Sequence, residues 1–366
     1  MAWEKELEES ISTIAQLGEY MELDPKKGAI LQEIIDIHPM RITRYYMSLI
    51  DETDPDDPIR KMAVPSEEEL NRTGSYDTSG ERENTIMPGL QHKYAQTALI
   101  LATNRCAMYC RYCFRKRLVG LRTEEIMERF NGAAKYIEEH EEINNVLISG
   151  GDPFILSTDV LSDFLERLSD ISHLDFIRFG TRVPVTFPDR ILEDDKLLTL
   201  LGNNSRENRR IYVVTQFNHP REITAKATGA VSRLIRAGVI VDNQTVLLNG
   251  VNDDPETLAE LQNKLVSIGV IPYYLFQCRP VKRVKSYFQV PLYKGYEIVE
   301  AAKERLNGHS KRFKYMMSHR TGKIEIVGVM DDYIYFKYHQ AHVPANIGKF
   351  FKRKINKTAG WLDELE

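Results

Sequence analysis

The chain has 366 residues, 42% of them hydrophobic, and its 49 basic and 53 acidic residues leave a net charge of −4. A chain of this size can bury one large core, or a core with a smaller appended part. The small negative charge excludes the basic field that attracts nucleic acid or an anionic membrane, so we expect neither partner. No stretch reaches the roughly 20 apolar residues that span a bilayer, and the charged start MAWEKELEES lacks the apolar run of a signal peptide.

The first 50 residues have the periodicity of helices. Leu7, Ile11 and Ile14 share one predicted helical face. The acidic, proline-containing run 51–58 predicts an exposed connection, and the polar sequence after it predicts no regular structure. We therefore assign residues 1–96 to an N-terminal helical region with an irregular connection.

From residue 97 a short apolar strand followed by an amphipathic helix repeats six times. Strands that are apolar on both faces belong to a parallel sheet covered by helices. We predict an α/β fold, with a partial (βα)6 TIM-like barrel over residues 97–307 and a doubly wound open sheet as the alternative. In both folds, chemistry takes place at the C-terminal ends of the strands. The predicted strands are Thr97–Thr103, Asn145–Ser149, Phe176–Gly180, Ile211–Thr215, Val239–Leu248 and Val270–Phe276.

Residues 308–366 form the predicted C-terminal extension. Two runs in it, Lys323–Val329 and Tyr333–Tyr338, flank a short polar turn, which predicts a β-hairpin. The basic tail 350–357 is typical of a solvated terminal segment rather than of a binding arm.

Three of the four cysteines, Cys106, Cys110 and Cys113, lie within eight positions directly after the first predicted strand. Thiolates this close repel one another and oxidise unless a metal neutralises them. A structural zinc site needs four protein ligands, and no paired Cys or His spacing supplies the fourth. A four-iron cluster with three thiolate ligands instead keeps one iron open for a small molecule. The plainer alternatives are a buried thiol cluster and a redox C-x-x-C pair, and a reduced cytoplasm suits all of them.

Polar and glycine residues also follow the later strands. The segment Ser149-Gly150-Gly151-Asp152 lets a backbone approach a ligand closely, and its carboxylate can accept a hydrogen bond from an ammonium. Each polar residue alone is typical of a strand-end cap, but together they predict the lining of one mouth. Those after the third, fourth and fifth strands are Thr181, Arg182, Gln216, Asn218, His219, Asn243 and Gln244.

The C-x3-C-x2-C spacing, with Tyr112 before its last cysteine, resembles the radical S-adenosylmethionine superfamily. The resemblance implies that the three cysteines hold a [4Fe–4S] cluster whose open iron is chelated by S-adenosylmethionine. One electron then releases a 5′-deoxyadenosyl radical. The resemblance and the mouth together place six residues at the S-adenosylmethionine site, and Asp152 among them is expected to receive the methionyl ammonium. They are Gly150, Gly151, Asp152, Arg182, Gln216 and Gln244.

Longer stretches, in order along nearly the whole chain, resemble the lysine 2,3-aminomutase family. They include MPGLQHKY, NRCAMYCRYCFRKR, ISGGDP, TQFNHPREIT, NQTVLLNGVND and IPYYLFQC. This resemblance implies a partial barrel, the cluster, S-adenosylmethionine and pyridoxal phosphate, and the movement of an amino group from C2 to C3 of an amino acid. The imine of that coenzyme provides a π-system through which the nitrogen shifts.

The family places its Schiff-base lysine after a glycine run, and Lys323 occupies that position although three of the glycines are replaced. The alternative is that Lys323 is only a charged residue at the start of a strand. Lys93 and Tyr94 match the residues that hold the coenzyme phosphate. A second family arginine is Thr97 here, and we expect Arg320 to compensate for its loss.

Arg115 matches the arginine that binds the substrate carboxylate. Arg279 and Met316 stand where the lysine-specific enzymes have two aspartates for the distal ammonium. Arg279 would repel an ammonium, so the sequence favours an acidic or phosphorylated side chain over lysine, with a solvated charge cluster as the alternative.

Two other functions stay open at this point. One is a radical enzyme that has lost pyridoxal phosphate, and the other is a non-enzymatic metal-cluster module. A branch of the family that modifies a lysine on a translation factor also keeps a protein substrate open. For the enzyme we expect a small amino acid substrate, a flavodoxin- or ferredoxin-type electron donor, a cytoplasmic location and a homo-oligomer.

Overall fold

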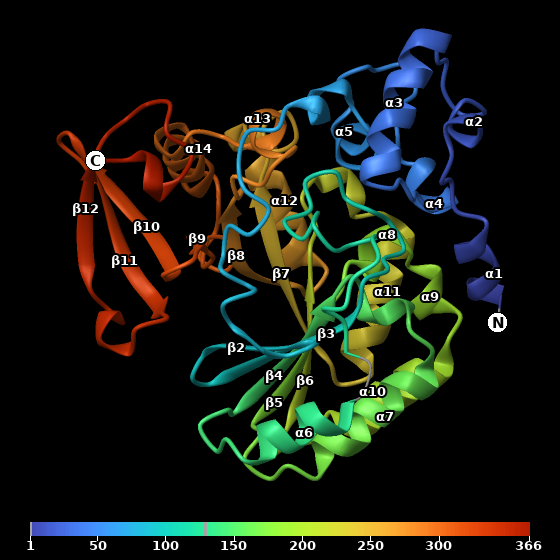
Figure 1. Cartoon of the computed structure of the whole chain (residues 1–366), viewed down its shortest axis with the longest axis vertical. Coiled ribbons are helices and arrows are strands. Elements are labelled where there is room, and N and C mark those ends of the chain that lie inside the picture. Colours follow the sequence, from blue (N-terminus) through green and yellow to red (C-terminus); the bar gives the residue numbers. More distant parts are fainter. Residues whose placement is uncertain (1, 128–129) are drawn as a thin grey trace.

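The computed structural model describes residues 2–127 and 130–366. Its strands form one twelve-stranded sheet in chain order, and Figure 1 shows the N-terminal helices and the C-terminal strands on opposite sides of the parallel strands. None of the described helices combines the length and apolar character needed to cross a bilayer.

Seven consecutive strands pair in parallel in the middle of this sheet. Their order in the sheet is their order along the chain. In a doubly wound sheet the strand order reverses partway through the sheet, so these strands form the predicted partial barrel instead. Two of the six predicted strands are confirmed with the same bounds, and the other four are confirmed within one residue at each end. The parallel strands are β3 Thr97–Thr103, β4 Asn145–Gly150, β5 Phe176–Gly180, β6 Arg210–Thr215, β7 Ile240–Leu247, β8 Ile271–Gln277 and β9 Lys314–His319.

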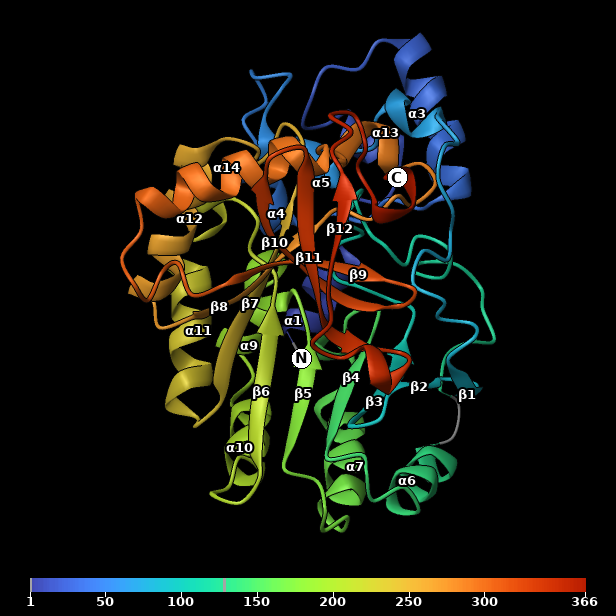
Figure 2. The same ribbon diagram turned by 90° about the vertical axis from the view of Figure 1, so that its left-hand side faces the viewer.

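Helices cover the outer face of these strands, and Figure 2 shows α7 and α10 behind β4, β5 and β6, with α11 to their left. Helix α12 begins at Pro255, and the side chain of Asp254 before it accepts from the backbone N–H groups of Glu256 and Thr257. Gly269, with φ +83°, follows its end. The helices are α6 Phe130–Glu138, α7 Thr158–Ser169, α8 Val183–Thr186, α9 Asp189–Leu192, α10 Asp195–Asn204, α11 Ala225–Arg236, α12 Pro255–Ser267, α13 Lys285–Phe288 and α14 Leu292–Glu304.

The N-terminal region is helical, but one predicted helix is wrong. Ile11 lies between two short helices and forms a β-bridge with Ile42, because the chain there pairs with a distant segment instead of continuing a helix. The run 51–58 is exposed as predicted except at its end, where Asp57 is buried and caps the next helix. The helices are α1 Ala2–Glu8, α2 Ile14–Leu17, α3 Pro25–Ile37, α4 Arg44–Met47 and α5 Pro58–Ala63, followed by the 3₁₀ turn η1 Glu67–Leu70.

Antiparallel strands extend the sheet at both edges. Before β3 they are β1 Thr85–Met87 and β2 Leu90–Tyr94, in a segment for which the sequence predicted no regular structure. After β9 they are β10 Gly322–Met330, β11 Tyr333–Ala341 and β12 Phe350–Lys354. The first two of these confirm the predicted hairpin, while the basic tail pairs with β11 as an edge strand. The division of the chain at residues 96 and 307 stays a prediction.

Candidate active site

A cavity of 380 Å³ lies inside the partial barrel, beside the loops that follow the parallel strands. Its wall also includes side chains of β2 and β10, so both antiparallel edges of the sheet contribute to it. Every residue that the sequence assigned to the cluster, cofactor and substrate sites lines this cavity except Asp152, whereas three residues of the predicted mouth, Asn218, His219 and Asn243, are buried outside its wall. The fold therefore brings together residues that are up to 230 positions apart, from Lys93 to Lys323.

The three cysteines of the loop after β3 are free thiols, and all three face the cavity. Burial raises the pKa of Cys106 well above its usual range and that of Cys113 to about 11, so thiolates here require a metal's positive charge. No three His, Cys, Asp or Glu side chains in the described part of the chain are arranged to hold a single metal ion. Three thiols that share a cavity without converging on one ion fit a multi-iron cluster, whose ligands attach to separate irons.

Arg182, directly after β5, links the cysteine loop to a buried network on the barrel wall. Its Nη1 donates to the Sγ of Cys110 at 3.0 Å, and its Nη2 pairs with the buried carboxylate of Glu222. That carboxylate also accepts from the hydroxyl of Tyr46 at 2.6 Å. Because the pair is buried, Arg182 is fixed in place beside the cluster loop.

Gly150 ends β4 and Gly151 follows it, and together they bring the loop after β4 against the end of β3 and the loop after it. A Cβ on Gly150, which has φ +112°, would lie 2.3 Å from the carbonyl oxygen of Thr103, and one on Gly151 would lie 2.2 Å from that of Arg105. No larger residue fits at either position without moving the backbone. The glycine backbone therefore forms cavity wall directly beside the cysteine loop.

Asp152 lies behind this wall rather than in it. Its two oxygens accept from the hydroxyl of Thr181 at 2.6 Å and the backbone N–H of Arg182 at 2.7 Å, and burial raises its pKa. The carboxylate thus ties the loop after β4 to the loop after β5. That it also receives an ammonium stays a prediction.

Lys323 opens β10 and reaches into the cavity, where its Nζ lies 4.7 Å from the ring centre of Tyr274. Burial lowers its pKa to about 7. Three nearby cations act in the same direction, namely Arg178, Arg279 and Lys93. Within the described residues Lys323 has no ion-pair partner, so a large share of its amine is neutral at physiological pH and available as a nucleophile.

Lys93, in β2, holds the turn between β9 and β10 close to the cavity. Its Nζ donates to the backbone carbonyls of Ser79 at 2.9 Å and His319 at 2.8 Å. Burial lowers its pKa to about 8 and raises that of the neighbouring Tyr94 to about 12. Both residues supply hydrogen-bond donors on the Lys323 side of the cavity.

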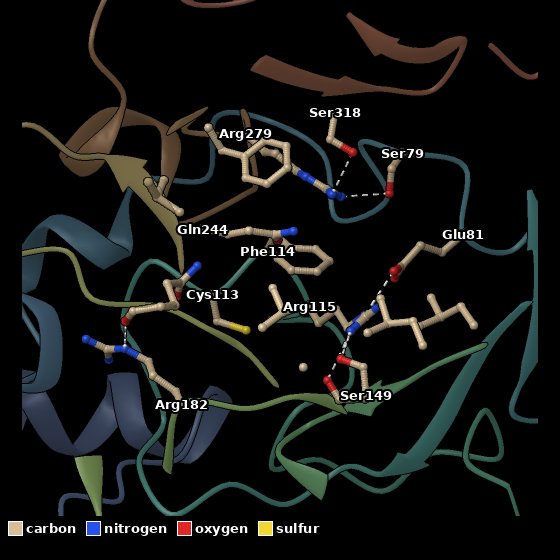
Figure 3. Close-up of a pocket in the computed structure, with 18 of the residues that line it drawn as sticks. Ser79, Glu81, Cys113, Phe114, Arg115, Ser149, Arg182, Gln244, Arg279 and Ser318 are labelled. Carbon is tan, nitrogen blue, oxygen red and sulfur yellow. Dashed lines mark hydrogen bonds and ion pairs between the residues drawn. The ribbon is translucent and has the colours of Figure 1, made fainter. Parts of the chain in front are cut away.

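Two arginines contact one aromatic ring, as Figure 3 shows. The guanidinium carbons of Arg115 and Arg279 lie 4.7 and 4.1 Å from the ring centre of Phe114. Arg115 pairs with Glu81 at 2.9 Å. Arg279 donates only to the hydroxyls of Ser79 at 2.8 Å and Ser318 at 3.0 Å, and it has no carboxylate partner among the described residues.

Sequence reasoning missed two charged residues that line this cavity and misplaced a third. Glu81 lies in the segment without predicted structure, and Arg178 lies inside a predicted strand. The prediction that Arg320 replaces the family arginine absent at position 97 is wrong. Its exposed side chain pairs with Glu83 and lies outside the cavity wall.

The fold and the three cysteines on the cavity wall define a radical S-adenosylmethionine enzyme, and the model of the radical SAM superfamily matches residues 100–261. Among solved structures, a radical SAM methyltransferase from Sphaerobacter thermophilus is 17% identical with a TM-score of 0.40, over 62% of this chain and 68% of its own.

Three relatives narrow this class. A protein of Aquifex aeolicus (strain VF5) assigned as an L-lysine 2,3-aminomutase is 42% identical over 344 residues, 94% of this chain and 92% of its own. The L-lysine 2,3-aminomutase of Clostridium subterminale is 37% identical, over 84% of this chain and 73% of its own. The glutamate 2,3-aminomutase of Clostridioides difficile (strain 630) is 36% identical, over 81% and 69%. The chain belongs to the 2,3-aminomutase family of radical SAM isomerases.

Proposed function

We propose that the protein is a pyridoxal phosphate-dependent 2,3-aminomutase that acts on a free amino acid with an acidic side chain. The observation that carries the proposal is that two cationic groups in the cavity, Lys323 and Arg279, form no ion pair with any described residue. Lys323 is a buried amine with a lowered pKa, as covalent attachment of a coenzyme requires. Arg279 is a guanidinium whose hydrogen bonds all go to hydroxyl groups, so an anion of the ligand can pair with it.

Each side chain has a distinct role in this proposal. Cys106, Cys110 and Cys113 hold a [4Fe–4S] cluster. S-adenosylmethionine lies against the glycine backbone after β4, with Arg182, Gln216 and Gln244 around it. Bound pyridoxal phosphate supplies the conjugated system through which the amino nitrogen shifts.

Arg115 and Arg279 hold the two carboxylates of the substrate, and Phe114 between them keeps the two sites apart. The substrate is therefore oriented at both ends before a hydrogen atom is removed from its β-carbon. A distal ammonium would lie beside the cation of Arg279, and the nearby acid Glu81 is already paired with Arg115 and Arg117, which disfavours lysine. We expect a flavodoxin or ferredoxin to supply the electron, a cytoplasmic location and a homo-oligomer.

The coenzyme is tested by borohydride reduction of the anaerobic, cluster-loaded protein with pyridoxal phosphate, followed by peptide mass spectrometry. We expect one dominant pyridoxyl adduct, on Lys323, because burial keeps this amine largely neutral while surface lysines stay protonated. The Lys323→Ala variant should lose the adduct and still cleave S-adenosylmethionine to 5′-deoxyadenosine. Adducts scattered over surface lysines would instead favour a radical enzyme that has lost the coenzyme.

The substrate is tested by anaerobic turnover of glutamate, aspartate and lysine with S-adenosylmethionine, pyridoxal phosphate and a reductant. We expect β-amino acid product from an acidic substrate and at least about 100-fold lower kcat/KM for lysine, because burying an unpaired charge costs about 3 kcal/mol or more. The Arg279→Gln variant should lose most of the activity with the acidic substrate, while the exposed Arg320→Gln variant should not. A preference of the wild type for lysine would refute this assignment.

A further inference from the structure

Arg178, in the middle of β5, lines the cavity beside Lys323, and none of the roles above uses it. Its Nη2 donates to the amide oxygen of Asn145. Its Nε is buried and has no hydrogen-bond partner among the described residues. Apart from the bond to Asn145, the guanidinium has no hydrogen-bond partner among the described residues.

No carboxylate forms an ion pair with this arginine in the described part of the chain. Asp242 in β7 is the acid whose charge acts on it, but the two side chains are not in ion-pair contact. A buried guanidinium without a directly paired counter-ion is costly to the folded protein. Its unpaired N–H groups match the geometry of an oxyanion, so we expect a ligand to provide the missing negative charge.

The surroundings of Arg178 distinguish a phosphate from a substrate carboxylate. Asn145 joins it to Thr97 in β3, since its Nδ2 donates to the threonine hydroxyl at 3.1 Å. The hydroxyl of Tyr94, three residues before Thr97, lines the same cavity and has no partner among the described residues. Arg115 and Arg279, the two arginines proposed to bind the substrate carboxylates, lie instead on the ring of Phe114 in the cysteine loop.

We propose that Arg178 binds the phosphate of the pyridoxal phosphate that Lys323 holds. The inference rests on the proposed function and adds a cation from the third parallel strand. Position 97 carries a neutral threonine where the family has an arginine. Hydrogen bonds from Thr97 to Asn145 and from Arg178 to Asn145 connect that position to Arg178, which would supply the missing positive charge to the phosphate.

The test compares the binding of pyridoxal phosphate with that of unphosphorylated pyridoxal to the cluster-loaded protein. Binding is measured by the absorbance change that accompanies covalent attachment. In Arg178→Met we expect a Kd for pyridoxal phosphate about 10- to 100-fold above wild type, the loss of one charge-assisted hydrogen bond. The Kd for pyridoxal should stay within about 2-fold of wild type, since that ligand carries no phosphate. Arg178→Lys, which keeps the charge but not the fork of N–H groups, should recover part of the lost affinity.

Arg209→Met is the matched control. Arg209 is also buried with an unpaired Nε, but it donates to backbone carbonyls at the foot of β6 and lies outside the cavity wall. The Arg209→Met variant should leave the affinities for pyridoxal phosphate and for pyridoxal unchanged, and it shows the effect of a general loss of stability. An equal loss of affinity for both ligands in Arg178→Met, or no loss for either, would overturn the inference. Failure of the wild type to attach either ligand at Lys323 would overturn the proposed function instead.

Discussion

The electrostatics of Lys323 show how a single side chain is made reactive. The amine is buried among cations and has no acid beside it in the described residues, so its protonated form is destabilised. The altered segment before it keeps Gly322, and a Cβ there would lie 2.2 Å from the backbone oxygen of Gln340. The last glycine is therefore needed for the pairing of β10 with β11, which positions the lysine.

A pH profile tests this arrangement. The rate of covalent attachment of pyridoxal phosphate, measured by stopped-flow absorbance, should rise with pH to a midpoint near 7 and stay level above it, because only the neutral amine reacts. An ordinary lysine, with a pKa of about 10.4, would give a rate that still rises at pH 9. Unphosphorylated pyridoxal is the control, since a shared midpoint excludes titration of the phosphate. A midpoint near 10 would contradict the lowered pKa.

Which site residues could be predicted from the sequence depends on whether a motif carries them. The cysteine loop, the glycines after β4 and Lys323 lie in stretches that resemble one family, and all of these residues line the cavity. Arg178 and Glu81 carry no such pattern, because a lone charge within a strand or a polar segment is typical of solvent exposure. Only the three-dimensional pairing shows that both are turned inward.

At the level of elements, the six parallel strands were predictable because each is a short apolar run between polar caps. The seventh, β9, has the sequence KYMMSH, whose methionines and ends do not favour a strand, and it forms because β8 and β10 offer hydrogen bonds on both sides. The same holds for β2, which is polar and pairs with β3. Ile11 marks the opposite error, where tertiary pairing overrides helical periodicity.

For the whole molecule, one buried carboxylate joins the N-terminal region to the cysteine loop. Glu69, in η1, makes a bidentate pair with Arg111 at 2.7 Å for both contacts, and it also accepts from Lys116. Although burial raises the pKa of this carboxyl, the two cations hold it at about 2. The N-terminal region thus supports the loop that carries the cluster ligands.

The buried ion pair of Glu69 with Arg111 makes the free energy of unfolding depend on pH in a defined direction. The pKa of Glu69 is lowered in the folded state, so its contribution is complete above the unfolded value of 4.5 and is lost as pH falls toward 2. The difference of about 2.5 pH units corresponds to about 3 kcal/mol. In urea unfolding at neutral pH, Glu69→Gln should be less stable than wild type by at least that amount, and the gap should narrow as pH falls below 4.5.

The exposed Glu67→Gln variant of the same turn is the control and should follow the wild type across this range. A gap between Glu69→Gln and wild type that stays constant from neutral pH to pH 3 would show that the carboxylate does not act through its charge.

Strand β3 has Lys93 and Tyr94 just before its first residue and the cysteine loop just after its last. Its seven extended residues span roughly 20 Å at about 3.3 Å each. The strand is therefore a rigid spacer that fixes how far the coenzyme-side residues lie from the cluster ligands. Inserting or deleting one residue within it would shift the two groups by about 3.3 Å and reverse which side chains face inward. Both cofactors would still have their ligands, but they would no longer be in register with a shared substrate.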